Sequence, residues 1–132
     1  MSLPAPSPEE SDERRRDEFE AVVERAVARI PEPFARQLDS VAIIVEDEPR
    51  PEQQRPGILL FGLYEGVPRT AWGATGAPVP SRITIYRLAH ERTYHDPVVR
   101  AEAVEGTVLH EVAHHLGIDE ATIRRIEAER RR

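Results

Sequence analysis

The chain has 132 residues, enough for one domain with its own core but not for a second lobe. Its formal net charge of −6 argues against nucleic-acid binding, and the absence of cysteine excludes disulfides, thiolate catalysis and cysteine-bound metal. The opening residues MSLPAPSPEE lack the basic and apolar regions of a signal peptide, and no apolar run reaches the ~20 residues of a membrane span. We therefore expect a soluble, cytoplasmic protein with no membrane partner.

The first third of the chain predicts a tail, a helix and a strand. Residues 1–11 are rich in Pro, Ser and Glu and are predicted to form a disordered N-terminal tail. Apolar residues at helical spacing then predict a helix from about Asp12 to Arg29. One short helical turn is expected over 34–39, and the β-branched run 41–45 predicts a strand.

The middle of the chain alternates loops with two further strands. Residues 46–56 are acidic and Pro-rich, which is typical of a loop. The continuous apolar run 58–63 predicts a strand covered on both faces, at the centre of the sheet. Residues 64–80 are rich in Gly and Pro and predict a long loop, and long loops in small domains are often functional. The alternating run 82–86 predicts a half-buried strand.

Two helices are predicted in the last third of the chain. Asp96 can cap the first of them, Pro97 suits its first position, and Gly117 can end it in the left-handed conformation. Asp119 can cap a last helix that reaches the Arg-rich end of the chain. The prediction is thus an α+β fold, a single compact domain over 12–132 in which a small sheet of about three strands packs against the N-terminal helix and the long helix.

The end of the long helix carries a metal-binding pattern, HEVAHHLGIDE over 110–120. His110 and His114 are four residues apart, so they share one helix face with their Cβ atoms ~5–6 Å apart. Two imidazoles at this spacing can bind one Zn²⁺. Glu111 lies beside them on the helix, toward the open side of the metal, where a carboxylate suits the role of general base.

A catalytic zinc site needs a third protein ligand. Because Gly117 lets the chain turn sharply out of the helix, a residue three positions later can return toward the metal, and that residue is Glu120. Asp119 is the alternative third ligand, although capping the last helix would occupy its carboxylate. Glu127, Glu129 and residues of the loops also remain open as candidates.

The other histidines are predicted to serve structure or to lie in solvent. His115 lies about 100° around the helix from His114, on the arc that faces the core, and is predicted to be a hydrogen-bonded core side chain. His90 and His95 flank the loop before the long helix, and we expect both to be solvated.

Taken in order, these motifs resemble the minimal zincins, a family of short bacterial zincin-like metallopeptidases. The run 110–120 is the strongest match, and the glycine-rich turn GLYEGVP over 62–68 is the second. Weaker matches are VAIIVEDEP over 41–49 and PSRITIY over 80–86. The resemblance implies a compact domain with a small sheet packed on the motif helix. It also implies one zinc ion held by two histidines and an acidic residue at the position of Glu120.

The motif and the resemblance together predict a zinc-dependent metallopeptidase that hydrolyses a peptide or protein substrate. Glu111 would take the proton of the attacking water and deliver it to the leaving amine. Tyr64, in the Gly-rich loop, is a candidate stabiliser of the oxyanion, although a tyrosine packed on the surface is the simpler interpretation. Either strand 58–63 or strand 82–86 could pair with an extended peptide.

The alternative prediction is a zinc-binding interaction or regulatory module with little or no proteolytic activity. One small lobe offers a shallow cleft, and a structural zinc would have four protein ligands rather than three and a water.

Overall fold

A mixed sheet of three strands organises the part of the chain that this computed structural model describes, residues 2–32, 34–66 and 81–130. The strands are β1 (Val41–Glu46), β2 (Gly62–Glu65) and β3 (Ser81–Tyr86), and their order in the sheet is β1-β3-β2. The central strand β3 pairs in parallel with β1 and antiparallel with β2. Both edges of this small sheet therefore belong to strands that precede β3 in the chain.

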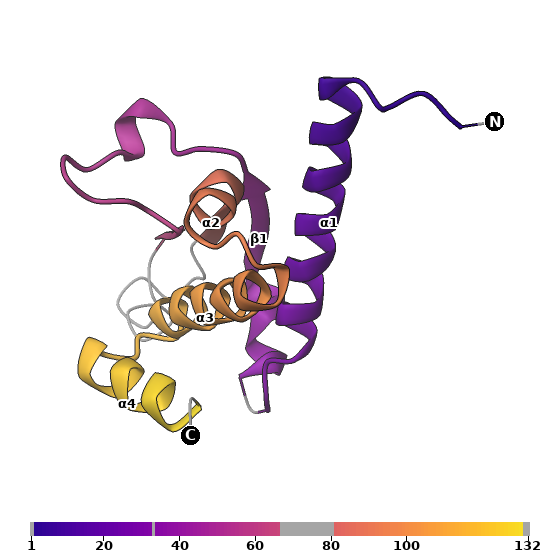
Figure 1. Ribbon diagram of the computed structural model, residues 1–132. Coiled ribbons are helices and arrows are strands. Elements are labelled where there is room, and N and C mark those ends of the chain that lie inside the picture. The colour runs from indigo at the N-terminus through magenta and orange to yellow at the C-terminus, as the bar shows by residue number, and fades with distance from the viewer. Residues whose placement is uncertain (1, 33, 67–80, 131–132) are drawn as a thin grey trace.

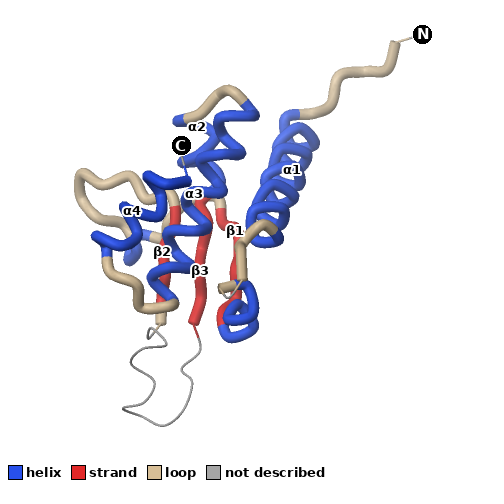
Figure 2. The backbone as a smooth tube through the Cα atoms, turned by 90° about the horizontal axis from the view of Figure 1, so that it is seen from below, coloured by secondary structure: helices blue, strands red, loops and turns tan. Residues whose placement is uncertain are grey.

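Helices cover one face of the sheet (Figure 1). The two long helices, α1 (Pro8–Ala28) and α3 (Pro97–His115), pack against the same face of the sheet (Figure 2). Helix α2 (Arg87–Thr93) follows β3 directly, α4 (Glu120–Arg130) follows α3, and short 3-10 helices span Ala35–Ser40 and Pro51–Gln53. The predicted α+β domain, with its small sheet against the N-terminal helix and the motif helix, is confirmed. No helix of the described residues is long and apolar enough to cross a membrane.

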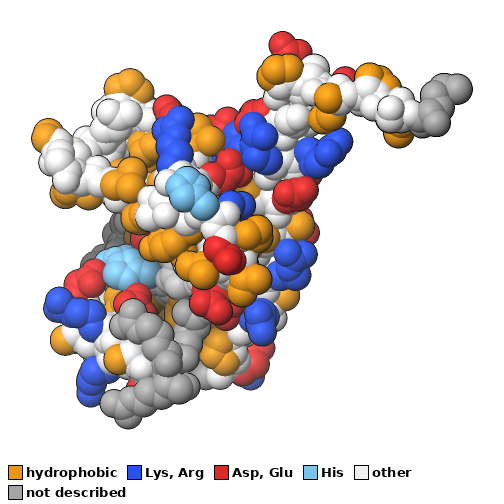
Figure 3. All heavy atoms as spheres, in the orientation of Figure 1, with side chains coloured by type: hydrophobic (Ala, Val, Ile, Leu, Met, Phe, Trp, Pro, Cys, Tyr) orange, Lys and Arg blue, Asp and Glu red, His pale blue; other side chains and the backbone are white. Residues whose placement is uncertain are grey.

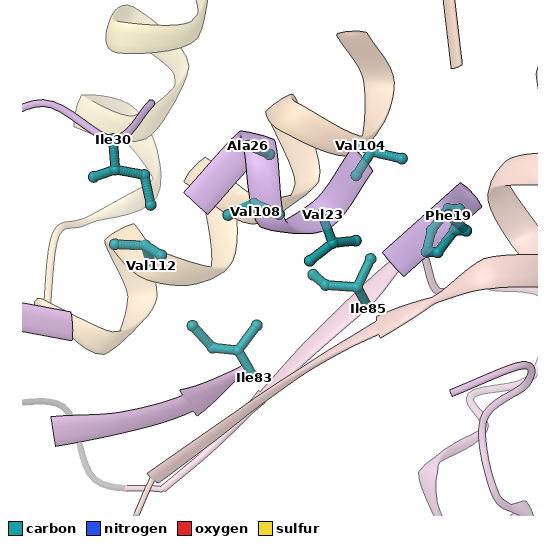
Figure 4. Close-up of a cluster of buried hydrophobic side chains, with 9 residues drawn as sticks. All are labelled: Phe19, Val23, Ala26, Ile30, Ile83, Ile85, Val104, Val108 and Val112. Atoms are coloured by element: carbon teal, nitrogen blue, oxygen red, sulfur yellow. The ribbon is translucent and has the colours of Figure 1, made fainter. Parts of the chain in front are cut away.

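The hydrophobic core lies between the sheet and the two long helices (Figure 4). Ile83 and Ile85 point to the same face of β3, because side chains two apart in a strand share a face, and both are fully buried. They meet apolar side chains of both long helices, namely Phe19, Val23 and Ala26 of α1 and Val104, Val108 and Val112 of α3. This packing holds α3 in place and leaves its histidine-bearing face outside the core.

Helix α1 begins four residues earlier than the predicted Asp12. The Ser7 hydroxyl accepts a hydrogen bond from the Glu10 main-chain N–H (3.1 Å), and the Glu10 carboxylate accepts one from the Ser7 N–H (3.3 Å). This reciprocal capping box satisfies two N–H groups that a helix end otherwise leaves without partners. Residues 8–11 therefore belong to the helix and not to the predicted tail.

The prediction that residues 58–63 form the central strand is wrong. Ile58 and Leu59 are 61% and 60% exposed, and the strand begins only at Gly62, at an edge of the sheet. The strand predicted as half-buried is the central one, and all of β3 except Arg82 is buried. A short apolar run is expected both in a strand buried within a sheet and in the apolar wall of a cleft. Here residues 59–61 line a cleft.

Strand β3 continues directly into α2, where a buried arginine gathers acidic side chains. The Arg87 guanidinium is 1% exposed and donates to Asp47 (2.8 Å), Asp12 (3.0 Å) and Glu91 (3.1 Å). Hydrogen bonds from Arg87 and Arg16 lower the pKa of Asp47 to about 2. A buried cation requires such partners, so this cluster ties α1, the β1–β2 connection and α2 together.

Candidate metal centre

Two imidazoles converge on one face of α3. The Nε2 atoms of His110 and His114 are 3.1 Å apart, and both side chains are about one third exposed. The helix that presents them starts as predicted, because the Asp96 carboxylate accepts from the N–H groups of Val98 (2.8 Å) and Val99 (3.2 Å).

The end of α3 turns the chain back toward this histidine pair. Gly117 has φ +75°, and its N–H donates to the carbonyl of His114, while the Ile118 N–H donates to that of Ala113, each at 3.0 Å. These two bonds form a Schellman motif, which needs a residue that tolerates the left-handed region. The predicted role of Gly117 is confirmed.

Glu120 follows this turn and faces both histidines. Its Oε1 atom is 3.2 Å from Nε2 of His114 and 3.7 Å from Nε2 of His110. Asp119 instead caps α4, since its Oδ1 accepts from the Thr122 N–H (2.8 Å), and this hydrogen bond lowers the pKa of Asp119. Glu120 thus lies beside the histidines, whereas the carboxylate of Asp119, the alternative third ligand, is used as a helix cap.

The three donor atoms fit a tetrahedral ion. Ligands that lie ~2.0–2.1 Å from a tetrahedral Zn²⁺ are about 3.3 Å from one another. The contacts of 3.1, 3.2 and 3.7 Å among His110, His114 and Glu120 lie around that value. Donor atoms of His110, Glu111 and His114 also all lie within 4.8 Å of one another. These residues can therefore hold a metal, with Glu120 as the carboxylate that contacts both imidazoles.

Glu111 lies buried beside the donors. It is 8% exposed, and burial raises the pKa of its carboxyl group, against the opposing effects of the two neighbouring histidines and of a hydrogen bond from the Tyr64 main chain. Strand β2 passes very close to it: a Cβ atom placed on Gly62 would lie 3.1 Å from Cγ of Glu111 and 2.8 Å from Cγ2 of Thr107. Glu111 is thus a buried carboxyl beside the two imidazoles, with its pKa raised above the ordinary value.

A carboxylate from α4 lies against the other ring nitrogen of His110. Oε1 of Glu127 is 3.1 Å from Nδ1 of His110. An imidazole whose Nδ1–H donates to a carboxylate presents the lone pair of Nε2 to a metal. Glu127 was left open as a ligand by the spacing alone, and the structure places it where it orients His110. Sequence reasoning missed this role because it depends on how α4 folds back over α3.

His115 is fully buried and hydrogen-bonded, so its predicted place in the core is confirmed. Its Nε2 is 3.0 Å from the Ser40 hydroxyl, and its Nδ1 is 3.2 Å from the Tyr64 hydroxyl. The Tyr64 hydroxyl also lies 3.1 Å from that of Ser81.

Tyr64 is therefore a half-buried residue of β2 whose hydroxyl already has protein partners, and not a loop residue on the surface. The partners of its hydroxyl lend no support to a role at the oxyanion, and that role stays a prediction. The last two residues of the glycine-rich turn, 67–68, lie outside the described residues.

The prediction that His90 is solvated is wrong, while His95 is exposed as expected. His90 belongs to α2 and is fully buried, with Nδ1 2.7 Å from the Tyr86 carbonyl oxygen and Nε2 2.9 Å from the Thr107 hydroxyl. The Phe61 ring lies against it, with centroids 5.0 Å apart. Burial lowers the pKa of His90, so its ring is neutral at pH 7. It is a buried, hydrogen-bonded side chain of the interior.

Comparisons with known proteins find a matching family and a similar solved structure. A family model described as zincin-like metallopeptidase matches residues 38–130. Among solved structures, a conserved hypothetical protein from Thermus thermophilus is similar with a TM-score of 0.53 and 26% identity, over 77% of this chain and 94% of the other. No curated protein gives a significant match. The family match includes the whole sheet together with α3 and α4, which carry the candidate donors.

Proposed function

The chain belongs to the zincin-like metallopeptidase family, and from that premise we propose that it is a zinc-dependent peptidase. In this proposal His110, His114 and Glu120 hold one Zn²⁺, and Glu111 is the general base. One observation carries the proposal: an oxygen of the Glu120 carboxylate lies 3.2 and 3.7 Å from the imidazole nitrogens of His114 and His110, although Glu120 belongs to α4 and the histidines to α3.

The proposed reaction is hydrolysis of a peptide bond. A zinc ion bound at this position would supply Lewis acidity, which lowers the pKa of water toward about 7 and polarises a carbonyl group. Glu111 accepts one proton from the attacking water as the new C–O bond forms, and it delivers that proton to the nitrogen as the C–N bond breaks. The hydrogen bond from the Tyr64 main chain holds the Glu111 carboxylate, and Glu127 orients His110.

Metal analysis of the purified protein, paired with cleavage of a broad peptide library, tests this proposal. We expect close to one zinc per chain in the natural protein and in the control His95→Ala, which removes an exposed histidine, and almost none in His110→Ala. Cleavage should disappear with the metal. Stoichiometric zinc without cleavage of any library peptide would overturn the peptidase and favour a zinc-binding regulatory module, while absence of zinc would overturn both.

Replacing Glu127 by Ala is expected to weaken zinc binding by about 10- to 100-fold, because His110 would lose the carboxylate that orients its ring. The measurement is the zinc Kd from competition with a chromophoric chelator. Glu129→Ala is the matched control, since it removes an exposed carboxylate from the same helix. Equal zinc affinities for the two variants would show that Glu127 does not position the ligand.

A further inference from the structure

A cleft of about 960 Å³ leads away from the candidate metal centre along α3. Its floor is one face of the helix, formed by residues three or four apart, Val99, Ala103, Gly106 and His110. From Val99 to His110 the helix rises ~16 Å, at 1.5 Å per residue. Since extended chain advances ~3.3 Å per residue, the floor has room for roughly five residues of an extended peptide.

One wall of this α3 cleft is apolar. It consists of the segment Leu59–Phe61 before β2 and of Tyr94, and Val99 continues it on the floor. Leu59 and Val99 are 60% and 46% exposed. Large apolar side chains gathered at one exposed place are typical of binding sites. A substrate side chain that covered them would remove apolar surface from water, which is favourable.

The opposite wall is acidic. Glu102, Glu105 and Glu127 line it, and among the described residues Arg29 lies beside them, with its guanidinium 3.5 Å from Glu105. Glu102 is exposed and forms no ion pair with any residue that the structure describes. In Figure 3 acidic side chains lie beside the lower of the two histidine patches, and hydrophobic side chains lie nearby. The wall therefore attracts cationic groups and repels anionic ones.

The two walls lie on opposite sides of the floor, because the α3 residues beside each wall point in different directions around the helix. Thr107 and Glu111 point toward Gly62 of β2, on the apolar side, as the close approach of that glycine shows. Glu102 and Glu105 lie about 100° or more around the helix from Thr107 and Glu111, on the side of Arg29. Successive side chains of an extended peptide also point in opposite directions. Adjacent substrate residues would thus meet different walls.

We propose that the α3 cleft selects peptides in which a large apolar residue is next to a basic residue, on one side of the bond to be cleaved. The apolar side chain lies against Leu59 and Phe61, and the basic one faces Glu102. This inference rests on the proposed peptidase function and names the substrate class of the same site.

The test measures binding separately from cleavage, with zinc-loaded Glu111→Gln protein and with the same variant after metal removal. The probes are fluorescent decapeptides that differ only at two adjacent positions, Leu-Lys, Leu-Glu and Ser-Lys, and the readout is anisotropy. We expect Leu-Lys to bind at least about 10-fold more tightly than either of the others, a difference of ~1.4 kcal/mol. The preference should persist without metal, because the walls supply it.

Two further substitutions, each made in the Glu111→Gln protein, test which wall recognises which side chain. Glu102→Lys should reverse the preference between Leu-Lys and Leu-Glu, and Leu59→Ser should remove the preference for Leu over Ser. Glu24→Lys, an equal charge reversal on the exposed face of α1, should change neither. Unaltered preferences in both cleft variants, or no binding of any of the three peptides, would overturn the inference.

Cleavage of the same peptides by protein with Glu111 intact separates this inference from the proposed function. Binding that depends on the walls, without any cleavage, would support the α3 cleft as a selective peptide-binding site and reject the peptidase. Cleavage whose sequence preference is unchanged by Glu102→Lys and by Leu59→Ser would support the peptidase and reject the inference.

Discussion

Glu111→Gln is expected to retain a full complement of zinc and to lower kcat/KM for peptide hydrolysis by at least ~100-fold. The amide has the same size as the carboxylate and can still accept the hydrogen bond from the Tyr64 main chain, so the site should keep its shape. It cannot accept the proton of the attacking water, which is the role proposed for Glu111. The measurement is kcat/KM on the best peptide from the library, together with zinc content.

Glu24→Gln is the control for this prediction, because it makes the same chemical change at an exposed position of α1. Unchanged cleavage by Glu111→Gln would reject Glu111 as the base. Loss of zinc from Glu111→Gln would have a different meaning, since Glu111 also lies within 4.8 Å of the histidine donors. That outcome would make Glu111 a ligand and leave the identity of the base open.

Gly62→Ala is expected to impair both stability and activity. The new Cβ atom would lie 2.8 Å from Cγ2 of Thr107 and 3.1 Å from Cγ of Glu111, so β2 must move away from α3. Such overpacking costs about 1–3 kcal/mol of folding free energy. Because β2 also supplies the main-chain hydrogen bond to Glu111, a shift of about 1 Å could lower turnover by up to ~100-fold. Urea unfolding and kcat/KM provide the two measurements.

A second substitution distinguishes this steric contact from a general defect. Thr107→Ser removes the methyl group that meets the new Cβ and keeps the hydroxyl that contacts His90. In the double variant we expect part of the lost stability to return, and a double-mutant cycle measures that coupling. If Gly62→Ala alone is as stable as the natural protein, or if the two changes are simply additive, the close approach of β2 to α3 has no energetic consequence.

The main features of the site follow from signals close together in the sequence. Asp96 and Pro97 start the helix, the spacing of His110 and His114 aligns their rings, and Gly117 ends the helix and turns the chain toward Glu120. Each of these depends on hydrogen bonds or side-chain positions within one or two helical turns. For that reason the arrangement of these residues could be predicted without knowledge of the fold.

Other predictions failed where one pattern has two physical explanations. The apolar run before β2 looked like a central strand, yet Ile58 and Leu59 are exposed. His90 looked like a loop residue, because nothing in its neighbourhood indicates that β3 passes directly into α2. In both cases burial depends on which distant element covers a side chain, and local periodicity does not contain that information.

The sequence by itself determined the helix with its two histidines, the buried side of His115 and the turn that presents Glu120, because local hydrogen bonding and helical periodicity govern all three. Only the tertiary structure decided that Glu127 contacts His110, that Gly62 lies against Glu111, and that an apolar and an acidic wall flank the same cleft. These contacts join residues separated by 17 positions in the first case and by several tens in the others. They arise from the packing of α4 and β2 on α3, which no local pattern specifies.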